Sequence, residues 1–269
     1  MNGRLLDEEE AGVSVFDHGF VTGDGVFESV LVHEHRPFAL RRHLERLERS
    51  ARQIRLKPPP PAELEGAVNL VVEEAALREA KVRITVTGGI GPLASMRSAG
   101  APTVVVAIAP LEGRPPQPAD VLVLPWPRND RSILSGAKTT SYAENVAALA
   151  WAVERGADEA VFLNLAGDLC EGTGTNVFVG IEGRLLTPPL SSGCLAGVTR
   201  ALVLEIADAV EEPVPAERLG EVTEAFLTST TRGAQPIRTV DGRALPECPG
   251  KLTSSVQERF AELLEEGTD

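Results

Sequence analysis

Three polar groups follow one another along the chain in an order that suggests chemistry. Lys138 supplies an amine, Glu171 supplies a carboxylate in a glycine-rich run, and Gly197 leads Thr199 into an expected helix. An amine forms Schiff bases, a carboxylate pairs with a protonated ring nitrogen, and the free amides of a helix start bind phosphate. Together the three groups fit pyridoxal phosphate, a cofactor that needs each of them.

Each of these groups also has an ordinary explanation. A lone lysine usually lies on the surface, Glu171 sits in a run typical of turns, and glycine-led helix starts are common without a ligand. Residues 136–139 could be taken for a phosphate-binding loop, but that pattern needs glycine directly before the lysine and again five residues earlier. Ala137 and Ser132 occupy those positions, which excludes this loop type. The ordinary explanations stay open at this point.

The composition excludes several classes of protein. The chain has 269 residues, of which 43% are hydrophobic and 24% charged, as expected for one large or two modest globular domains. Its net charge of −13 disfavours a nucleic-acid binder, because phosphate backbones require patches of Lys and Arg. The N-terminal residues lack the basic-then-apolar order of a signal peptide. The sequence contains no run of about 18 apolar residues, so neither a membrane span nor a membrane partner is expected.

Cysteine and histidine are few and scattered. The cysteines lack metal-type spacing, and reduced thiols in a cytoplasm are their expected state. The histidines lack the spacing of a zinc site, so no metal is expected. The residues are Cys170, Cys194 and Cys248, and His18, His33, His35 and His43.

The pattern of elements predicts two domains, at residues 1–118 and 119–269. The proline-rich stretch 110–118 is typical of a connection between them. Strands mixed with two helices predict a small α+β domain before this connection. The expected strands there are 13–16, 26–32, 82–88 and 103–109, and the expected helices are 41–54 and 62–79.

In the second part, Lys138 is expected just ahead of a helix. Ser141 and Glu144 form a Ser-x-x-Glu capping box for a helix that continues through Val153 and stops at Gly156. The lysine would thus be held by rigid structure without lying inside it. The other expected strands are 120–125, 159–164, 175–181, 184–187 and 225–229, and the other expected helices are 197–210 and 250–265.

Seven ordered stretches carry a resemblance over nearly the whole chain: 17–28, 43–47, 135–145, 171–178, 186–189, 197–200 and 227–231. They resemble fold-type IV pyridoxal-phosphate enzymes (aminotransferase class IV), a family of branched-chain and D-amino-acid aminotransferases and 4-amino-4-deoxychorismate lyases. The resemblance implies an α/β (α+β) fold, with a small N-terminal α+β domain and a larger C-terminal α/β domain with a barrel-like mixed sheet. It also implies pyridoxal 5′-phosphate as the cofactor and a homodimer.

Carried over position by position, the resemblance implies a role for each residue of the cofactor site. Lys138 would form the Schiff base and move the substrate Cα proton, and Glu171 would pair with the pyridine nitrogen. Tyr142 would face the phenolic oxygen, although its spacing from the lysine is one residue short of the family pattern. The implied phosphate ligands are Arg46, Val198, Thr199, Ser229 and Thr230.

Two arginines are implied candidates for binding the substrate carboxylate. Arg83 lies in a strand where branched-chain enzymes carry such an arginine. D-amino-acid enzymes place theirs in the following loop, at the position of Leu93, and Arg97 follows four residues later. The other implied substrate contacts are Phe27, Ser29 and Thr231.

The resemblance therefore implies a transaminase. It would move an amino group from an amino acid, of the D- or branched-chain type, to a 2-oxo acid such as 2-oxoglutarate or pyruvate. Glu28 favours transamination because some lyases carry threonine there, whereas Ser29 would give a lyase its pocket hydroxyl. The alternatives are a 4-amino-4-deoxychorismate lyase, which eliminates pyruvate to give 4-aminobenzoate, and a non-catalytic cofactor-binding relative. Retention of Lys138 and Glu171 argues against the last.

Overall fold

The chain divides into two compact units in a computed structural model that describes residues 1–111 and 117–268. Unit 1 comprises Met1–Glu112, Ala137–Tyr142 and Gly267–Asp269, and unit 2 comprises Gly113–Gly136 and Ala143–Glu266. The predicted domains, 1–118 and 119–269, place the Lys138 segment in the second part of the chain, whereas the structure groups it with unit 1. The predicted connection 110–118 lies mostly outside the described residues.

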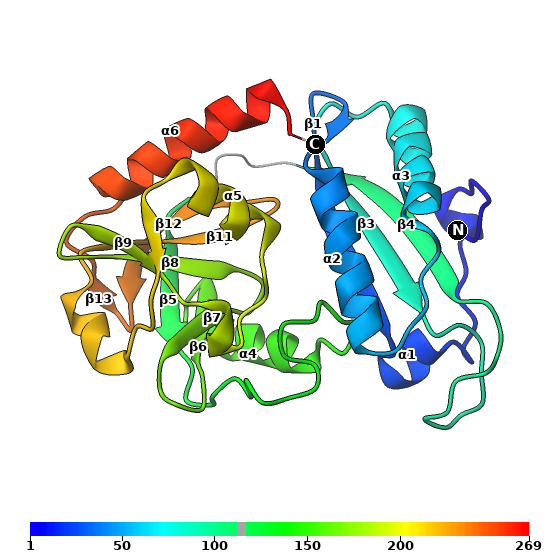
Figure 1. Ribbon diagram of the computed structural model, residues 1–269, viewed down its shortest axis with the longest axis horizontal. Coiled ribbons are helices and arrows are strands. Elements are labelled where there is room, and N and C mark those ends of the chain that lie inside the picture. The colour runs from blue at the N-terminus through cyan, green and yellow to red at the C-terminus, as the bar shows by residue number, and fades with distance from the viewer. Residues whose placement is uncertain (112–116, 269) are drawn as a thin grey trace. The chain divides into compact units, whose positions relative to one another are not determined.

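Unit 1 contains an antiparallel sheet and two long helices (Figure 1). The short helices η1 (Glu8–Glu10) and α1 (His18–Thr22) precede the sheet. The strands, in their order across the sheet, are β2 (Arg36–Pro37), β1 (Gly25–His33), β3 (Ala80–Thr87) and β4 (Thr103–Pro110). The long helices are α2 (Leu40–Gln53) and α3 (Pro61–Ala75).

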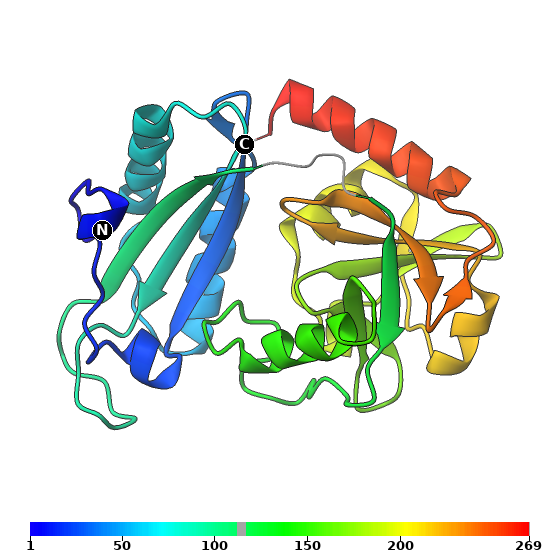
Figure 2. The ribbon, with the colours of Figure 1, turned by 180° about the vertical axis from the view of Figure 1, so that it is seen from behind.

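Alternation along the strands decides which face of this sheet the helices cover. Val26 and Val30 of β1 and Ile84 of β3 pack in one core with Leu44 and Leu47 of α2. Because successive side chains of a strand point to opposite faces, Phe27 and Ser29 of β1 and Arg83 of β3 lie on the other face. Figure 2, seen from behind, shows the strands in front of the helices.

The segment Ala137–Tyr142 attaches to the edge of β1 that does not pair with β3. Phe27 N donates to Lys138 O at 3.1 Å, and Thr140 N donates to Gly25 O at 2.9 Å. Lys138 N donates to the hydroxyl of Ser50 on α2 at 3.1 Å. The backbone at the lysine is therefore held by both the sheet and a helix, which explains why it belongs to unit 1.

Unit 2 is built on a curled mixed sheet. The strands, in order, are β10 (Ala209–Glu211), β9 (Arg184–Thr187), β8 (Asn176–Ile181), β11 (Glu224–Ser229), β12 (Gly233–Val240), β5 (Ala119–Val123), β6 (Glu159–Leu163) and β7 (Leu169–Gly172), with β13 (Arg243–Ala244) paired to β12. The helices are α4 (Ala143–Val153), α5 (Val198–Ile206) and α6 (Lys251–Glu266), with 3-10 turns η2 (Leu190–Ser192) and η3 (Ala216–Glu221).

Both faces of this sheet are packed, and the strand alternation again assigns the side chains. Val177 and Val179 of β8 join Leu227 of β11 in one core. Phe178, between the two valines, and Phe226, next to Leu227, point the other way and stack with their ring centroids 4.9 Å apart. Their cluster also contains side chains of α5 and α6, so the two helices cover this second face.

Most predicted elements are confirmed in unit 1, with two differences. The helix expected at 62–79 ends at Ala75, because Ala76 takes a left-handed backbone conformation with φ 49°. The strand expected at 13–16 is wrong. That segment forms a turn in which Asp17 N donates to Ser14 O at 2.9 Å.

In unit 2 the five expected strands and the terminal helix are confirmed, but β7, β10, β12 and β13 were not expected. The helix expected at 197–210 ends at Ile206, and residues 209–211 form β10. The predicted capping box is wrong. The Ser141 hydroxyl donates to Gly23 O at 2.9 Å, and Glu144 pairs with Arg128.

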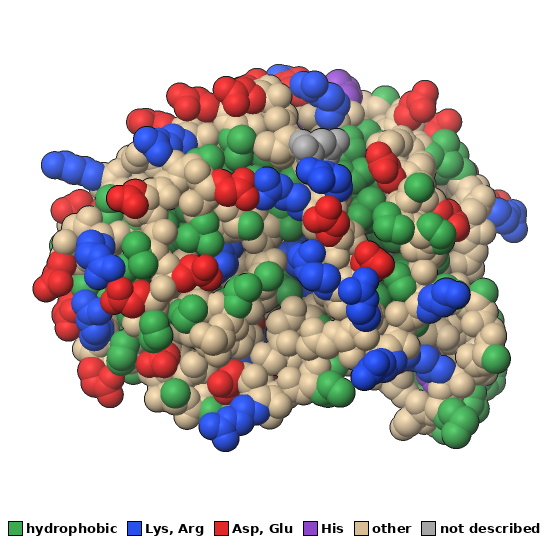
Figure 3. All heavy atoms as spheres, viewed as in Figure 1, with side chains coloured by type: hydrophobic (Ala, Val, Ile, Leu, Met, Phe, Trp, Pro, Cys, Tyr) green, Lys and Arg blue, Asp and Glu red, His purple; other side chains and the backbone are tan. Residues whose placement is uncertain are grey.

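Acidic and basic side chains are both spread over the face seen in Figure 3. Within the described ranges, none of the helices has the length and apolar character needed to cross a membrane.

Candidate active site

In unit 1, five predicted site residues gather on the sheet face that α2 and α3 leave uncovered. Phe27 is at the centre, with the Arg83 guanidinium carbon 3.8 Å and the Lys138 Nζ 4.4 Å from its ring centroid. The Tyr142 ring meets Phe27 edge-on at 5.4 Å, and Ser29 pairs with Arg83 across the strands. The structure thus places an amine and a guanidinium over one aromatic ring, a favourable contact for both cations.

Arg83 as a whole residue is exposed on β3, although its guanidinium lies against the Phe27 ring. Burial lowers the pKa of its guanidinium, and the nearby Tyr142 acts in the opposite direction. Weak hydration and a planar fork of donors suit an arginine to binding a carboxylate.

On the covered face, Arg46 forms a buried network that the sequence did not predict. Its Nε and Nη2 donate to Glu28 at 2.7 and 2.6 Å, and the Glu28 carboxylate also contacts His43 Nδ1 at 2.8 Å. Burial raises the pKa of Glu28, but Arg46 and His43 outweigh it and hold that pKa at about 2. Burial lowers the pKa of His43 despite Glu28. Two of the three guanidinium nitrogens of Arg46 are thus engaged by Glu28. The role of Arg46 as a phosphate ligand stays a prediction.

Arg97, a predicted substrate contact, is engaged by neighbouring groups of unit 1. Its Nε donates to Asp24 at 2.6 Å, and its Nη2 also contacts that carboxylate. Its Nη1 and Nη2 donate to the carbonyls of Arg55 and Ile54 at 2.6 and 2.9 Å. All three guanidinium nitrogens are therefore engaged in holding the loop in place, and hydrogen bonding to Asp24 raises the pKa of Arg97.

In unit 2, Glu171 lies on β7 with a partner at each carboxylate oxygen. Leu195 N donates to its Oε2 at 2.8 Å, and Arg128 Nε lies 3.5 Å from its Oε1. Leu195 is two residues ahead of the N-cap of α5. The predicted ring-nitrogen partner is thus tied to the segment that leads into the predicted phosphate site.

The start of α5 has the features of an anion-binding helix end. Gly197 is the N-cap and supplies no side-chain cap, while Val198 and Thr199 are buried. The amides of a helix's first turn have no acceptor within the helix. A Cβ on Gly197 would overlap Asn176 Oδ1, so only glycine allows this close approach. Asn176 in turn donates to Leu195 O at 2.8 Å.

Hydroxyl groups at the end of β11 complete this set. Thr228 pairs with Asn176 across the strands, which brings the end of β11 next to the start of α5. Among the residues that the structure describes, the buried hydroxyls of Thr228 and Ser229 have no hydrogen-bond partner. Thr230 and Thr231 follow in the half-buried turn. Unpartnered hydroxyls beside uncapped helix amides fit a bound phosphate group.

Two charged residues of unit 2 belong to this framework and were not predicted from the sequence. Arg128 contacts Glu171, as described above. Glu159 is fully buried, accepts from Thr173 N at 3.2 Å and pairs with Arg232 Nη1 at 2.9 Å, so it links the Glu171 loop to the turn after β11. One feature of the sequence could have pointed to Glu159: it is a glutamate at the first position of an otherwise apolar strand.

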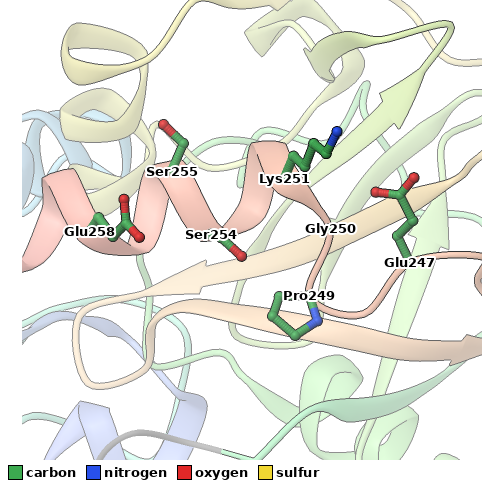
Figure 4. Close-up of a pocket in the computed structure, with 7 residues that line it drawn as sticks. All are labelled: Glu247, Pro249, Gly250, Lys251, Ser254, Ser255 and Glu258. Carbon is green, nitrogen blue, oxygen red and sulfur yellow. The ribbon is translucent and has the colours of Figure 1, made fainter.

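Two other polar clusters carry none of the predicted site residues. A shallow pocket at the start of α6 is lined by Glu247, Lys251 and Glu258 (Figure 4), and buried Glu224 already accepts from the Thr253 amide at 2.7 Å. In unit 1, His33, Glu34 and Glu79 lie close together, but Arg78 holds Glu34.

The Gly197 contact gives a direct test of the predicted phosphate site. Gly197→Ala should displace the start of α5 and weaken pyridoxal phosphate binding by about tenfold or more, since overpacking costs about 1–3 kcal/mol. Fluorescence titration of the cofactor measures this change. Gly220→Ala is the matched control in unit 2, because a Cβ there meets nothing within 4 Å. Equal cofactor affinity in the two variants would contradict the assignment.

Comparisons with known proteins agree with this arrangement. The family model described as amino-transferase class IV matches residues 25–240. A Methanocaldococcus jannaschii protein provisionally named branched-chain-amino-acid aminotransferase is 34% identical, over 98% of this chain and 95% of its own. The D-alanine aminotransferase of Bacillus licheniformis is 29% identical, over 95% of this chain and 93% of its own.

A solved structure adds a bound cofactor. The PLP-bound form of a hypothetical aminotransferase from Mycobacterium tuberculosis has a TM-score of 0.85 and is 28% identical, covering 98% of this chain and 95% of that one.

Proposed function

Because the chain belongs to the class IV aminotransferases, which are pyridoxal-phosphate enzymes, we propose that it transfers the amino group of a branched-chain amino acid to a 2-oxo acid such as 2-oxoglutarate. The observation that carries this choice of substrate is the position of Arg83. Its guanidinium stacks on Phe27, and the Lys138 amine contacts the same ring. An arginine there suits the substrate carboxylate.

We assign the remaining roles from the family resemblance and from the contacts described above within each unit. Bound pyridoxal phosphate supplies an electron sink for the substrate's Cα. Lys138 would hold the cofactor and move the Cα proton, and Glu171 would accept a hydrogen bond from the ring nitrogen. The first-turn amides of α5 and the hydroxyls of Ser229 and Thr230 would bind the phosphate. Tyr142 and Thr231 remain candidate contacts of the cofactor and the substrate.

Arg83 is favoured over Arg97 as the carboxylate ligand because of what each arginine already binds. Arg97 is engaged by Asp24 and two carbonyl groups, as described above. Arg83 instead stacks on an apolar ring and lies opposite Ser29. This difference supports a branched-chain donor rather than the D-amino-acid donor that Arg97 would serve.

The test is a half-reaction panel. Purified enzyme loaded with pyridoxal phosphate is mixed with paired L- and D-forms of valine, leucine and alanine, and conversion of the cofactor to its amine form is followed by absorbance. Branched-chain donors should react best. Arg83→Gln should raise KM by about 10- to 100-fold, the effect of losing a charged hydrogen bond. Lys81→Gln, an exposed change on the same strand, should leave KM unchanged. Preference for D-alanine with a silent Arg83→Gln would overturn the proposal.

The position of Ser29 supports the alternative function, a 4-amino-4-deoxychorismate lyase. Its hydroxyl lies on the same face as Phe27 and pairs across the strands with Arg83. Pyruvate release from 4-amino-4-deoxychorismate, with no half-reaction for any amino donor, would establish the lyase instead.

We also propose that the enzyme is a cytoplasmic homodimer. Support for the homodimer comes from exposed apolar side chains of Phe16, Ile90 and Leu93, which are brought together when Gly91 N donates to Phe16 O at 3.1 Å. The cytoplasmic location is supported by the three cysteines of the chain, which are all free thiols. Sedimentation at the mass of a single chain would contradict the homodimer.

A further inference from the structure

Arg128 is a half-buried arginine in the loop after β5, and its contacts converge on Glu171. Its guanidinium carbon lies 3.8 Å from the ring centroid of Phe162 on β6. Phe162 pairs with Glu171 across β6 and β7, so the two side chains share one face of the sheet. The stacked guanidinium is therefore brought alongside the carboxylate, and its Nε lies 3.5 Å from Glu171 Oε1.

The other edge of this guanidinium is fixed by α4. Arg128 Nη1 pairs with Glu144 and donates to Asn145 Oδ1 at 3.2 Å. Asn145 in turn donates to Thr173 O, two residues after Glu171. Arg128 is thus anchored by an aromatic ring on one side and by the start of a helix on another.

The edge of Arg128 that faces Glu171 has unused donors. Within residues 1–111 and 117–268, its buried Nε and Nη2 have no hydrogen-bond acceptor. Arg46 uses the same pair of nitrogens to bind Glu28 at 2.7 and 2.6 Å. At Arg128 the corresponding edge is set next to the Glu171 carboxylate at slightly greater distance, with Nε 3.5 Å from Oε1.

We propose that Arg128 is a positioning residue for Glu171. This inference rests on the proposed function, in which Glu171 accepts a hydrogen bond from the ring nitrogen of pyridoxal phosphate. The guanidinium attracts the ionised carboxylate and holds Oε1, while the Leu195 amide holds Oε2 at 2.8 Å. The carboxylate then keeps one orientation and its negative charge, both of which the ring nitrogen requires.

The test is a double-mutant cycle on the full-length enzyme, made of Arg128→Gln, Glu171→Gln and their combination. Three quantities are measured for each variant: the dissociation constant of pyridoxal phosphate, the absorbance spectrum of the bound cofactor and the rate of the donor half-reaction. Arg128→Gln alone should weaken cofactor binding and slow the half-reaction by about tenfold, as expected for residues in direct contact. Added to Glu171→Gln, it should have little further effect, and both single variants should shift the spectrum in the same direction.

Two further variants separate positioning from a structural role. Glu154→Gln removes an exposed ion pair with Arg155 that does not touch Arg128, and it should change none of the three quantities. Arg128→Lys keeps the charge and should restore part of the affinity and the spectrum. Thermal unfolding of each apo-protein identifies any variant that is simply misfolded, and Arg128→Lys then carries the test.

The outcomes distinguish this inference from the proposed function. If Glu171→Gln impairs the enzyme but Arg128→Gln is silent, or if their effects add in full, the positioning role is overturned while the function of Glu171 stands. If Glu171→Gln itself changes neither the spectrum nor the half-reaction, the proposed role of Glu171 fails and the inference about Arg128 fails with it.

Discussion

Lys138→Ala is expected to lower the rate of the amino-donor half-reaction by at least about 100- to 10,000-fold, the contribution of a positioned acid–base group. The reason is that the lysine's Nζ is the group proposed to hold the cofactor and to move the Cα proton. Stopped-flow absorbance with saturating cofactor and donor measures the rate. The near-visible absorbance of cofactor attached to lysine should disappear in the same variant.

The fold should survive this substitution, because the contacts that fix the segment use its backbone. Phe27 N and Ser50 Oγ bond to the carbonyl and the amide of residue 138, and both groups remain in alanine. Lys81→Ala, on the exposed side of β3, is the control for loss of a lysine from unit 1. A Lys138→Ala enzyme that keeps the visible absorbance and at least a tenth of the rate would refute the assignment.

Glu28→Gln is expected to lower the free energy of unfolding by about 3–5 kcal/mol, the range found when one partner of a buried ion pair is removed. Arg46 and His43 would lose their shared carboxylate in an interior where Glu28 is fully buried. Urea unfolding monitored by circular dichroism measures this change. Glu34→Gln is a close control, since Glu34 makes a similar ion pair with Arg78 at the surface, and its loss should leave stability nearly unchanged.

The buried Glu28 ion pair also predicts how the free energy of unfolding depends on pH, and the sign follows from the pKa of Glu28. The pKa of Glu28 is about 2 in the folded chain against an ordinary 4.5, a difference of 2.5 and thus about 3 kcal/mol. A carboxyl with a lowered pKa contributes its stability above pH 4.5 and loses it as the pH falls toward 2. Buried His43, whose pKa is lowered from 6.5, also favours unfolding below that pH.

The free energy of unfolding of the native chain should therefore fall steeply on acidification. In the Glu28→Gln variant, the part of this fall between pH 4.5 and 2 should be absent. Equal slopes in the two proteins over that interval would show that the Glu28 pair does not set the acid response.

The candidate cofactor residues could be picked out in the sequence, whereas the network around them could not. Lys138, Glu171 and Gly197 were recognisable because each lies beside an unusual local pattern, a glycine-rich run or a helix start. Arg128 and Glu159 have no such pattern. Their partners are brought to them only by strand pairing, between β6 and β7 for Phe162 and Glu171, and single-sequence periodicity does not specify which strands pair.

The same physical limit explains the errors in the fold. The strands β10 and β13 are two or three residues long, too short to show a period, and β12 contains Pro236, which is unfavourable in a paired strand. Arg97 was proposed as a substrate contact from its place in the loop after β3, and that role stays a prediction. What it binds depends on Asp24, which is distant in sequence, so a lone arginine in a loop could not reveal it.

The attachment of Ala137–Tyr142 to β1 has a consequence for dissecting the protein. Unit 1 is discontinuous in the chain, because it combines residues 1–112 with these six residues and with residues 267–269. A fragment that stops near residue 118 would lack both the lysine and the backbone that pairs with the outer edge of β1. Gene-level truncation at the proline-rich connection therefore cannot yield unit 1 intact, and any split version of this enzyme must supply residues 137–142 to it separately.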